Sequence, residues 1–198
     1  MTKPRIAFLC GSLRKDSFHR RLGQAVMSSA ADRLDFVEVE IGDLPLYNQD
    51  LDGKDPPAEW SRFRQEMKTV DGVLFACPEY NRGITGVLKN AIDVGSRPYG
   101  RSVYTKKPAA AFSGSTGMTG GFGANHALRQ SCVFLDMPIM QQPEAYWGLL
   151  NDEKVGIDGT VHDETVQKLV VKFAAAFANW VDLIRAGCAK IAEDPAHQ

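Results

Sequence analysis

Short apolar runs alternate along this chain with longer segments of helical period. Five runs are candidate strands, at residues 6–10, 36–39, 72–77, 109–113 and, shortest, 138–140. Their apolar residues are consecutive instead of alternating, which is typical of strands buried on both faces of a parallel sheet. The pattern therefore predicts an α/β fold with a five-stranded parallel sheet.

Between the strands, apolar residues recur every three or four positions, the period of one helix face. This spacing predicts helices over 18–29, 60–70 and 121–134, although Gly123 interrupts the last and its apolar face is irregular. The C-terminal segment is the most regular. Its apolar positions step by four, three, four, three and four, at Val166, Val170, Phe173, Phe177, Trp180 and Ile184. We expect one continuous helix there.

Right-handed crossovers between these elements give a doubly wound sheet with a helical layer on each face. In such three-layer folds, ligands bind outside the carboxyl ends of the strands. Three unusual loops leave those ends, at residues 11–18, 78–86 and 113–121. We expect the site at these loops. No linker or repeat divides the chain, so residues 1–198 are expected to form a single domain.

Composition narrows the function further. The chain carries 23 basic and 24 acidic residues, a formal net charge of −1, so no global field favours nucleic acid or an anionic membrane. The four cysteines lie far apart without a C-x-x-C motif, which argues against a metal site or a disulfide framework. No apolar run is long enough for a signal peptide or a membrane span. We expect a cytoplasmic protein that binds neither nucleic acid nor membrane.

The first loop has the chemistry of an anion site. Its sequence GSLRKDSF combines hydroxyls with backbone N–H groups at the start of a predicted helix, where the helix dipole favours a phosphate. The forked guanidinium of Arg14 matches phosphate oxygens. We expect Ser12, Arg14, Ser17 and His19 to line a phosphate pocket.

Two alternatives bear on the same loop. Ser17 is also a natural helix N-cap, and Arg20 and Arg21 can be an ordinary solvated helix face, with Arg20 the better placed to support the phosphate. Among named motifs, the loop lacks the second glycine of a dinucleotide fingerprint, and Lys15 is followed by Asp16 where a Walker A loop has serine or threonine. With these motifs excluded, the loop is best suited to a single terminal phosphate. We expect Arg14 to contact it and Lys15 and Arg21 to lie in solvent.

The second and third loops suit a planar ring. Pro78 ends the third strand, and Glu79, Tyr80 and Asn81 then offer an acceptor, a stacking surface and an amide. The third loop, SGSTGMTGG, exposes amides and hydroxyls and leaves room for a ring beside its backbone. Taken singly, each loop is also compatible with an ordinary polar turn or a flexible connection.

Three motifs together resemble the NAD(P)H-dependent FMN reductase family. They are G-S-L-R-K-x-S-F at 11–18, P-E-Y-N-x-G-x-x-G-x-L-K-N-A-I-D at 78–93 and S-x-G-x-x-G-G at 115–121, and the resemblance extends to about residue 144. This family has a flavodoxin-like fold and includes quinone, azo-dye and chromate reductases. The resemblance implies strand order 2-1-3-4-5 and one tightly held FMN in a single FMN-binding domain.

The resemblance also implies a role for each loop. The FMN phosphate would lie against Ser12, Arg14, Ser17 and His19, with Phe18 beside them. The isoalloxazine would meet Pro78, Glu79, Tyr80 and Asn81 on one side and Ser113, Ser115 and Gly117 on the other. His19 departs from the asparagine common in similar sequences, and its protonation would make FMN binding sensitive to pH.

The activity implied is hydride transfer from NADPH or NADH, by way of the flavin, to a small-molecule acceptor such as a quinone, an azo compound, a metal oxyanion or free flavin. The flavin carries this chemistry, so no catalytic side chain is expected. A flavodoxin-type electron carrier and a redox-sensing flavoprotein remain alternatives. Homodimers or homotetramers are usual in similar proteins, and Tyr99, Tyr104, Tyr146 and Trp147 are candidates either to cover a neighbour's flavin or to pack under loops.

Overall fold

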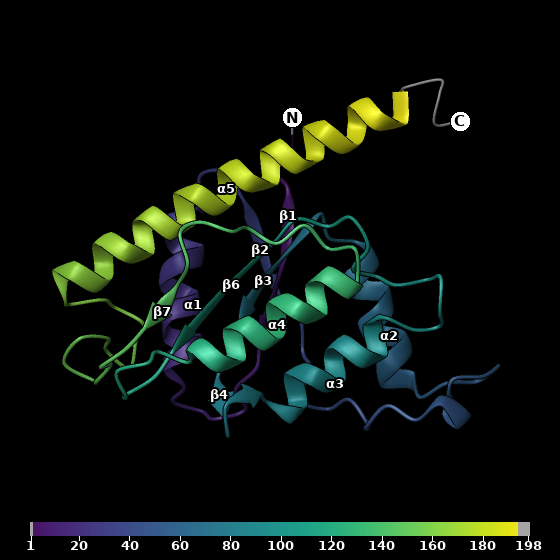
Figure 1. Ribbon diagram of the computed structural model, residues 1–198, viewed down its shortest axis with the longest axis horizontal. Coiled ribbons are helices and arrows are strands. Elements are labelled where there is room, and N and C mark those ends of the chain that lie inside the picture. The colour runs from purple at the N-terminus through teal and green to yellow at the C-terminus, as the bar shows by residue number, and fades with distance from the viewer. Residues whose placement is uncertain (1, 194–198) are drawn as a thin grey trace.

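The computed structural model describes residues 2–193 and shows a central parallel sheet between two helical layers (Figure 1). Its five strands lie in the order β2-β1-β3-β6-β7. They are β1 Arg5–Cys10, β2 Asp35–Glu38, β3 Gly72–Ala76, β6 Ala109–Gly114 and β7 Tyr146–Trp147. A separate two-stranded hairpin, β4 Glu79–Tyr80 with β5 Gly83–Ile84, follows β3.

Five α-helices cover the sheet in two layers. They are α1 Phe18–Ser29, α2 Ala58–Lys68, α3 Gly86–Gly95, α4 Phe122–Phe134 and α5 Glu164–Glu193, with a short 3₁₀ helix, η1 Gln49–Leu51, before α2. One buried cluster joins one face of the sheet to α2, α3 and α4. The other joins the opposite face to α1 and α5. The predicted three-layer α/β arrangement with a five-stranded parallel sheet is therefore present.

The predicted fifth strand was wrong. Residues 138–140 make only a single bridge, between Ala109 and Ile139, while the fifth strand of the sheet is β7, which pairs with Ser113 and Gly114 of β6. Pro138 has no N–H to donate, so a continuous ladder cannot run through it. The edge strand is thereby placed beside the third loop instead of at the amino end of β6.

A helix and a hairpin were also absent from the sequence prediction. Helix α3 buries Leu88, Ala91 and Ile92 at helical spacing. The β4–β5 hairpin turns through Asn81 and Arg82, whose φ angles of 53° and 66° are left-handed. Two successive left-handed residues make the two-residue turn that matches the twist of a hairpin.

Asn90 of α3 explains part of the long middle motif. Its side-chain oxygen accepts from the Tyr47 N–H at 2.8 Å, and its amide donates to the carbonyls of Leu44 and Pro45 at 3.1 and 3.0 Å. The residue is buried. It therefore fastens the segment after β2 to α3, which is a structural role.

The aromatic residues divide between core and surface. Tyr104 and Trp147 are buried, which favours the alternative that they pack within the protein, and the Tyr104 hydroxyl donates to the Ala91 carbonyl at 2.8 Å. Tyr99 is 86% exposed.

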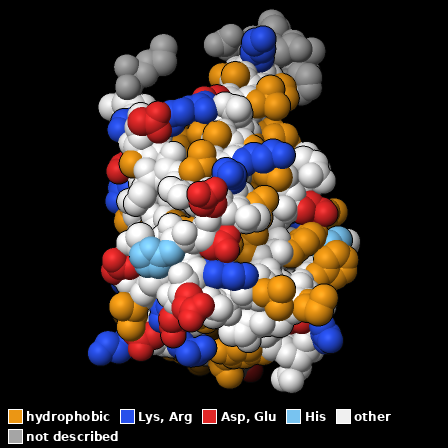
Figure 2. Space-filling view, turned by 90° about the vertical axis from the view of Figure 1, so that its left-hand side faces the viewer, with side chains coloured by type: hydrophobic (Ala, Val, Ile, Leu, Met, Phe, Trp, Pro, Cys, Tyr) orange, Lys and Arg blue, Asp and Glu red, His pale blue; other side chains and the backbone are white. Residues whose placement is uncertain are grey.

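Side chains of both charges mix over the face shown in Figure 2, in keeping with the balanced composition. Within residues 2–193, no helix is long and apolar enough to cross a membrane.

Candidate functional site

Three hydrogen bonds tie together the loops at the carboxyl ends of β1, β3 and β6. The hydroxyl of Thr85, which precedes α3, donates to the Gly11 carbonyl at 2.7 Å and joins the second loop to the first. The Gly114 N–H donates to Nε2 of His19 at 3.1 Å and joins the third loop to α1. The Ala124 N–H of α4 donates to Oε2 of Glu79 at 3.0 Å. The three predicted loops therefore form one assembly.

The first loop presents unsatisfied backbone donors. Ser17 is the N-cap of α1, and its hydroxyl accepts from the His19 N–H at 3.2 Å. The Ser12 hydroxyl accepts from the Arg14 N–H at 3.4 Å. Apart from that of Arg14, no backbone N–H of residues 12–18 has an acceptor in the part of the chain that is described. Such a row of free amides at a helix N-terminus is typical of a phosphate site.

Arg14 is the available guanidinium at this loop. It is exposed and makes no ion pair within residues 2–193, whereas Arg20 is paired with Glu38. Arg14 lines a cavity of about 390 Å³. The other lining residues come from the first two loops and the start of α3: Gly11, Leu13, Tyr80, Thr85, Gly86 and Val87. The cavity therefore joins the predicted phosphate and ring regions.

Arg21 does not lie in solvent, contrary to expectation. Its side chain is 7% exposed and contacts Asp152 at 2.6 Å, and it donates to the Val155 carbonyl at 3.0 Å. The guanidinium lies 4.7 Å from the ring centre of Phe18. Arg21 thus fastens α1 to the segment before α5, and this packing occupies one face of the Phe18 ring.

The structure also changes the role of His19. The imidazole is buried, and Phe112 lies parallel to it with ring centres 6.4 Å apart. Burial lowers the pKa of His19 from 6.5 to about 4, and a backbone hydrogen bond to Cys77 opposes this only in part. Because Nε2 accepts the Gly114 N–H, the ring is neutral and holds loops together. The ring of His19 is thus engaged within the protein, and its predicted contact with phosphate stays a prediction.

Glu79 acts within the protein. Its carboxylate accepts from the Ala124 N–H near the start of α4 and from Arg82 at 3.3 Å. Gly123 permits this approach, since a Cβ there would lie 2.9 Å from Oε2 of Glu79. A carboxylate at a helix N-terminus is stabilised by the free N–H groups. The glycine that weakened the helix prediction thus has a packing reason.

The other predicted residues of the second loop differ in their exposure. Pro78 is buried, Tyr80 is 54% exposed and lines the cavity beside Arg14, and Asn81 lies at the exposed turn. Of the four residues predicted here, Tyr80 and Asn81 offer accessible side chains. Pro78 and Glu79 shape the backbone.

The third loop also contains one buried residue and two accessible residues of the predicted set. Ser113 is fully buried, and its N–H and hydroxyl both point to the Ala145 carbonyl, at 2.9 and 3.4 Å. The side chain of Ser113 therefore serves the fold, and the contact of this residue with the ring stays a prediction. The Ser115 hydroxyl bonds to the backbone of Gly117, at 3.0 and 3.1 Å, in a turn at the surface. Ser115 and Gly117 therefore remain accessible.

The donor set fits the phosphate and ring of an FMN molecule. Free amides, the hydroxyls of Ser12 and Ser17 and the guanidinium of Arg14 suit a phosphate monoester, and the exposed ring of Tyr80 beside the cavity suits a planar heterocycle. Sequence reasoning missed Thr85, which closes the first loop onto α3. The only feature of the sequence that pointed to Thr85 is its position directly before the start of a helix, where threonine is common.

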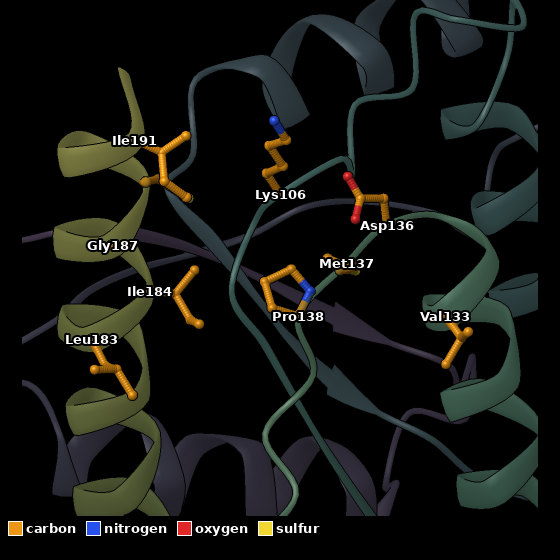
Figure 3. Close-up of a pocket in the computed structure, with 10 residues that line it drawn as sticks. Lys106, Val133, Asp136, Met137, Pro138, Leu183, Ile184, Gly187 and Ile191 are labelled. Atoms are coloured by element: carbon orange, nitrogen blue, oxygen red, sulfur yellow. The ribbon is translucent and has the colours of Figure 1, made fainter. Parts of the chain in front are cut away.

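A larger cavity lies elsewhere. A space of about 920 Å³ separates the C-terminal part of α5 from residues 133–138, at the amino end of β6. Figure 3 shows apolar side chains from both segments facing it, with Lys106 and Asp136 on one side. It shares no residue with the three loops, and its lining is mostly aliphatic. Size alone therefore does not mark the site in this fold.

Comparison with known proteins agrees with the geometry. The chain is 52% identical over 185 residues to a quinone reductase of Pseudomonas putida, covering 91% of this chain and 96% of the relative. It is 42% identical over 178 residues to a 2-hydroxy-1,4-benzoquinone reductase of a Burkholderia species, covering 89% and 96%. The structure of FerB, a flavoenzyme NAD(P)H:(acceptor) oxidoreductase of Paracoccus denitrificans, superposes with a TM-score of 0.85 at 38% identity, covering 90% and 97%.

The family assignment covers all three loops. The sequence model described as NADPH-dependent FMN reductase matches residues 4–152, from β1 through β7, and so includes the free amides of the first loop, the β4–β5 hairpin and the third loop. The chain therefore belongs to the NADPH-dependent FMN reductase family.

Proposed function

We propose that this chain is an FMN-dependent NAD(P)H:quinone oxidoreductase built as a single FMN-binding domain over residues 1–198. The observation that carries the proposal is the assembly of three loops around free amides, Arg14 and the Tyr80 ring. Its relatives named quinone reductases support the acceptor class. Azo compounds, metal oxyanions and free flavin are further acceptors within this proposal.

Each loop has its own task in binding. The amides of residues 12–18, with the hydroxyls of Ser12 and Ser17, hold the phosphate, and Arg14 adds a charge-assisted contact. The backbone of residues 78–81, with Tyr80, bounds one side of the ring, and Ser115 and Gly117 bound the other. When bound, FMN supplies two-electron chemistry between NADPH or NADH and the acceptor.

The protein's further contribution is position. His19, Thr85 and Glu79 make hydrogen bonds that fix the three loops relative to one another. Tyr80 presents an exposed ring, so the cavity is bounded on one side by an aromatic side chain and remains open to a second ligand. Such an arrangement suits two substrates that use one cleft in turn.

Assembly and location belong to the same proposal. A homodimer or homotetramer accords with the common closed symmetry of soluble enzymes. A cytoplasmic location is supported by four cysteines that are all free thiols.

A two-part measurement tests the binding and the activity. Purified protein should carry releasable FMN, and the holoprotein should oxidise NADPH or NADH with benzoquinone much faster than an equal concentration of free FMN. Bound FMN without acceleration would instead support an electron carrier or sensor and would refute the oxidoreductase assignment.

The placement of the phosphate has its own test. Replacing Arg14 with alanine should weaken FMN binding by about 10- to 100-fold, the value of a charge-assisted hydrogen bond to phosphate. The matched control is Lys15→Ala, because Lys15 is a neighbouring exposed cation that also makes no ion pair within the described chain. Fluorescence titration with FMN measures both. Equal losses in the two variants would mean that the phosphate is misplaced.

A further inference from the structure

Three aromatic rings gather where α4 and β7 begin. Phe122 is the first residue of α4, His126 lies one turn later, and Tyr146 starts β7. Ring centres are 4.2 Å apart for Phe122 and His126, 5.2 Å for Phe122 and Tyr146, and 5.9 Å for His126 and Tyr146. These three residues are called the aromatic cluster below.

The aromatic cluster adjoins the site. Phe122 directly follows the third loop, and a Cβ at Gly120 would lie 2.5 Å from the carbonyl carbon of Tyr146, so the loop packs against β7. Glu79 of the second loop binds the N–H of Ala124, between Phe122 and His126 on the same helix. The outer edge of the cluster is open, since Phe122 is 50% exposed. An apolar ring can therefore reach it beside the flavin loops.

Polar groups link this cluster to solvent. Nε2 of His126 lies 3.1 Å from the Tyr146 hydroxyl, and Tyr146 is also hydrogen-bonded to the exposed Glu144. Burial, together with this bond and the charge of Glu144, raises the pKa of Tyr146 to about 12. The hydroxyl therefore keeps its proton, and the direction of its hydrogen bond with Nε2 follows the tautomer of His126. Nδ1 of His126 has no hydrogen-bond partner among residues 2–193.

Quinone reduction needs a proton source as well as a hydride. A quinone becomes a hydroquinone by gaining two electrons and two protons, and a hydride brings both electrons but only one proton. The other ring oxygen is left as a phenolate that must be protonated. Among the groups already described, Glu79 caps α4, and His19 is buried and neutral.

Building on the function proposed above, we propose that the aromatic cluster is the quinone subsite and that His126 is its proton donor. The quinone ring packs against Phe122. Protonated His126 gives its Nδ1 proton to the phenolate oxygen: the N–H bond breaks, an O–H bond forms, and the ring is left neutral with Nε2–H still donated to Tyr146. Solvent then restores the proton to Nδ1.

A comparison of acceptors separates this role from a structural one. Benzoquinone needs a proton, whereas ferricyanide takes single electrons and none. In His126→Gln holoprotein, benzoquinone turnover should fall about 10- to 100-fold, as expected for loss of a general acid. Ferricyanide turnover and the reduction of bound flavin by NADPH should stay within about twofold, all rates being divided by bound FMN. The matched control is His162→Gln, an exposed histidine outside the aromatic cluster, which should leave every rate unchanged.

Two further variants test the remaining parts. Phe122→Ala should raise the KM for benzoquinone about fivefold with a smaller effect on kcat, because it removes a ring contact. Tyr146→Phe keeps the ring and removes only the hydroxyl, so it should lower kcat for benzoquinone and leave the KM near that of the unaltered protein.

Each outcome has a definite reading. Equal losses with benzoquinone and ferricyanide would show that the cluster merely supports the third loop, and an unchanged benzoquinone rate in His126→Gln would show that the proton comes from elsewhere. Either result overturns the inference. Failure of both NADPH and NADH to reduce bound flavin in the unaltered protein would instead overturn the proposed function.

Discussion

His19 makes the stability of the fold depend on pH. Its buried ring must stay neutral to accept the Gly114 N–H, and its pKa is lowered from 6.5 to about 4. Between these values the unfolded chain binds a proton that the folded chain does not. The contribution of His19 is therefore fully present above about pH 6.5 and is lost as the pH falls toward 4. At about 1.4 kcal/mol per pKa unit, the loss is about 3 kcal/mol.

The variant His19→Gln isolates this effect. The glutamine oxygen can accept from the Gly114 N–H as Nε2 does, but it does not titrate in this range. Urea unfolding at a fixed excess of FMN, repeated from pH 7.5 to pH 4, gives the free energy of unfolding for both proteins. The unaltered protein should lose about 3 kcal/mol more than the variant over this interval.

Carboxylates and the other histidines titrate in both proteins, so their effects cancel in the difference. Two parallel curves would refute the reasoning, because they would mean that His19 binds protons equally in the folded and unfolded states. A larger loss in the glutamine variant would contradict the sign of the effect.

Three more substitutions follow from the packing. Arg82→Gly should raise the free energy of unfolding by about 1 kcal/mol, measured by urea, because φ of 66° strains a residue with a Cβ; a loss would mean that the exposed contact to Glu79 matters more. Arg21→Met should lower the free energy of unfolding by about 1–2 kcal/mol, because the hydrogen bond to the Val155 carbonyl is lost. A loss of stability no larger than that of Arg20→Met would contradict the role of Arg21 in fastening α1 to the segment before α5. Asn90→Leu should cost about 2–4 kcal/mol, because three backbone groups lose their partner; Lys89→Leu, on the exposed side of α3, serves as control.

The sequence pattern predicts the buried strands well, and the three loops that it singles out do lie together at the carboxyl ends of those strands. Runs such as 6–10 and 72–77 are apolar on consecutive positions, and only a strand covered on both faces buries all of them. The edge strand carries no such signal. β7 has two residues, and a run around Pro138 resembled a strand more closely although it makes a single bridge.

Side-chain roles within the site were less predictable. Residue type indicated that Ser17, His19 and Glu79 matter, but each can serve either a ligand or the protein. The choice depends on groups distant in sequence: Gly114 for His19, and Ala124 for Glu79. Spacing along the chain does not encode such pairings. Free backbone amides, by contrast, follow from a loop that precedes a helix, and these were anticipated.

The three hydrogen bonds between the loops also bear on how fast the cofactor is captured. They are made by protein groups alone, through Thr85, His19 and Glu79. Ordering a backbone residue costs about 1–2 kcal/mol in conformational entropy, and loops fastened before FMN arrives have already met that cost during folding. Association then needs no preceding loop closure, so the observed capture rate should rise in proportion to FMN concentration without reaching a plateau.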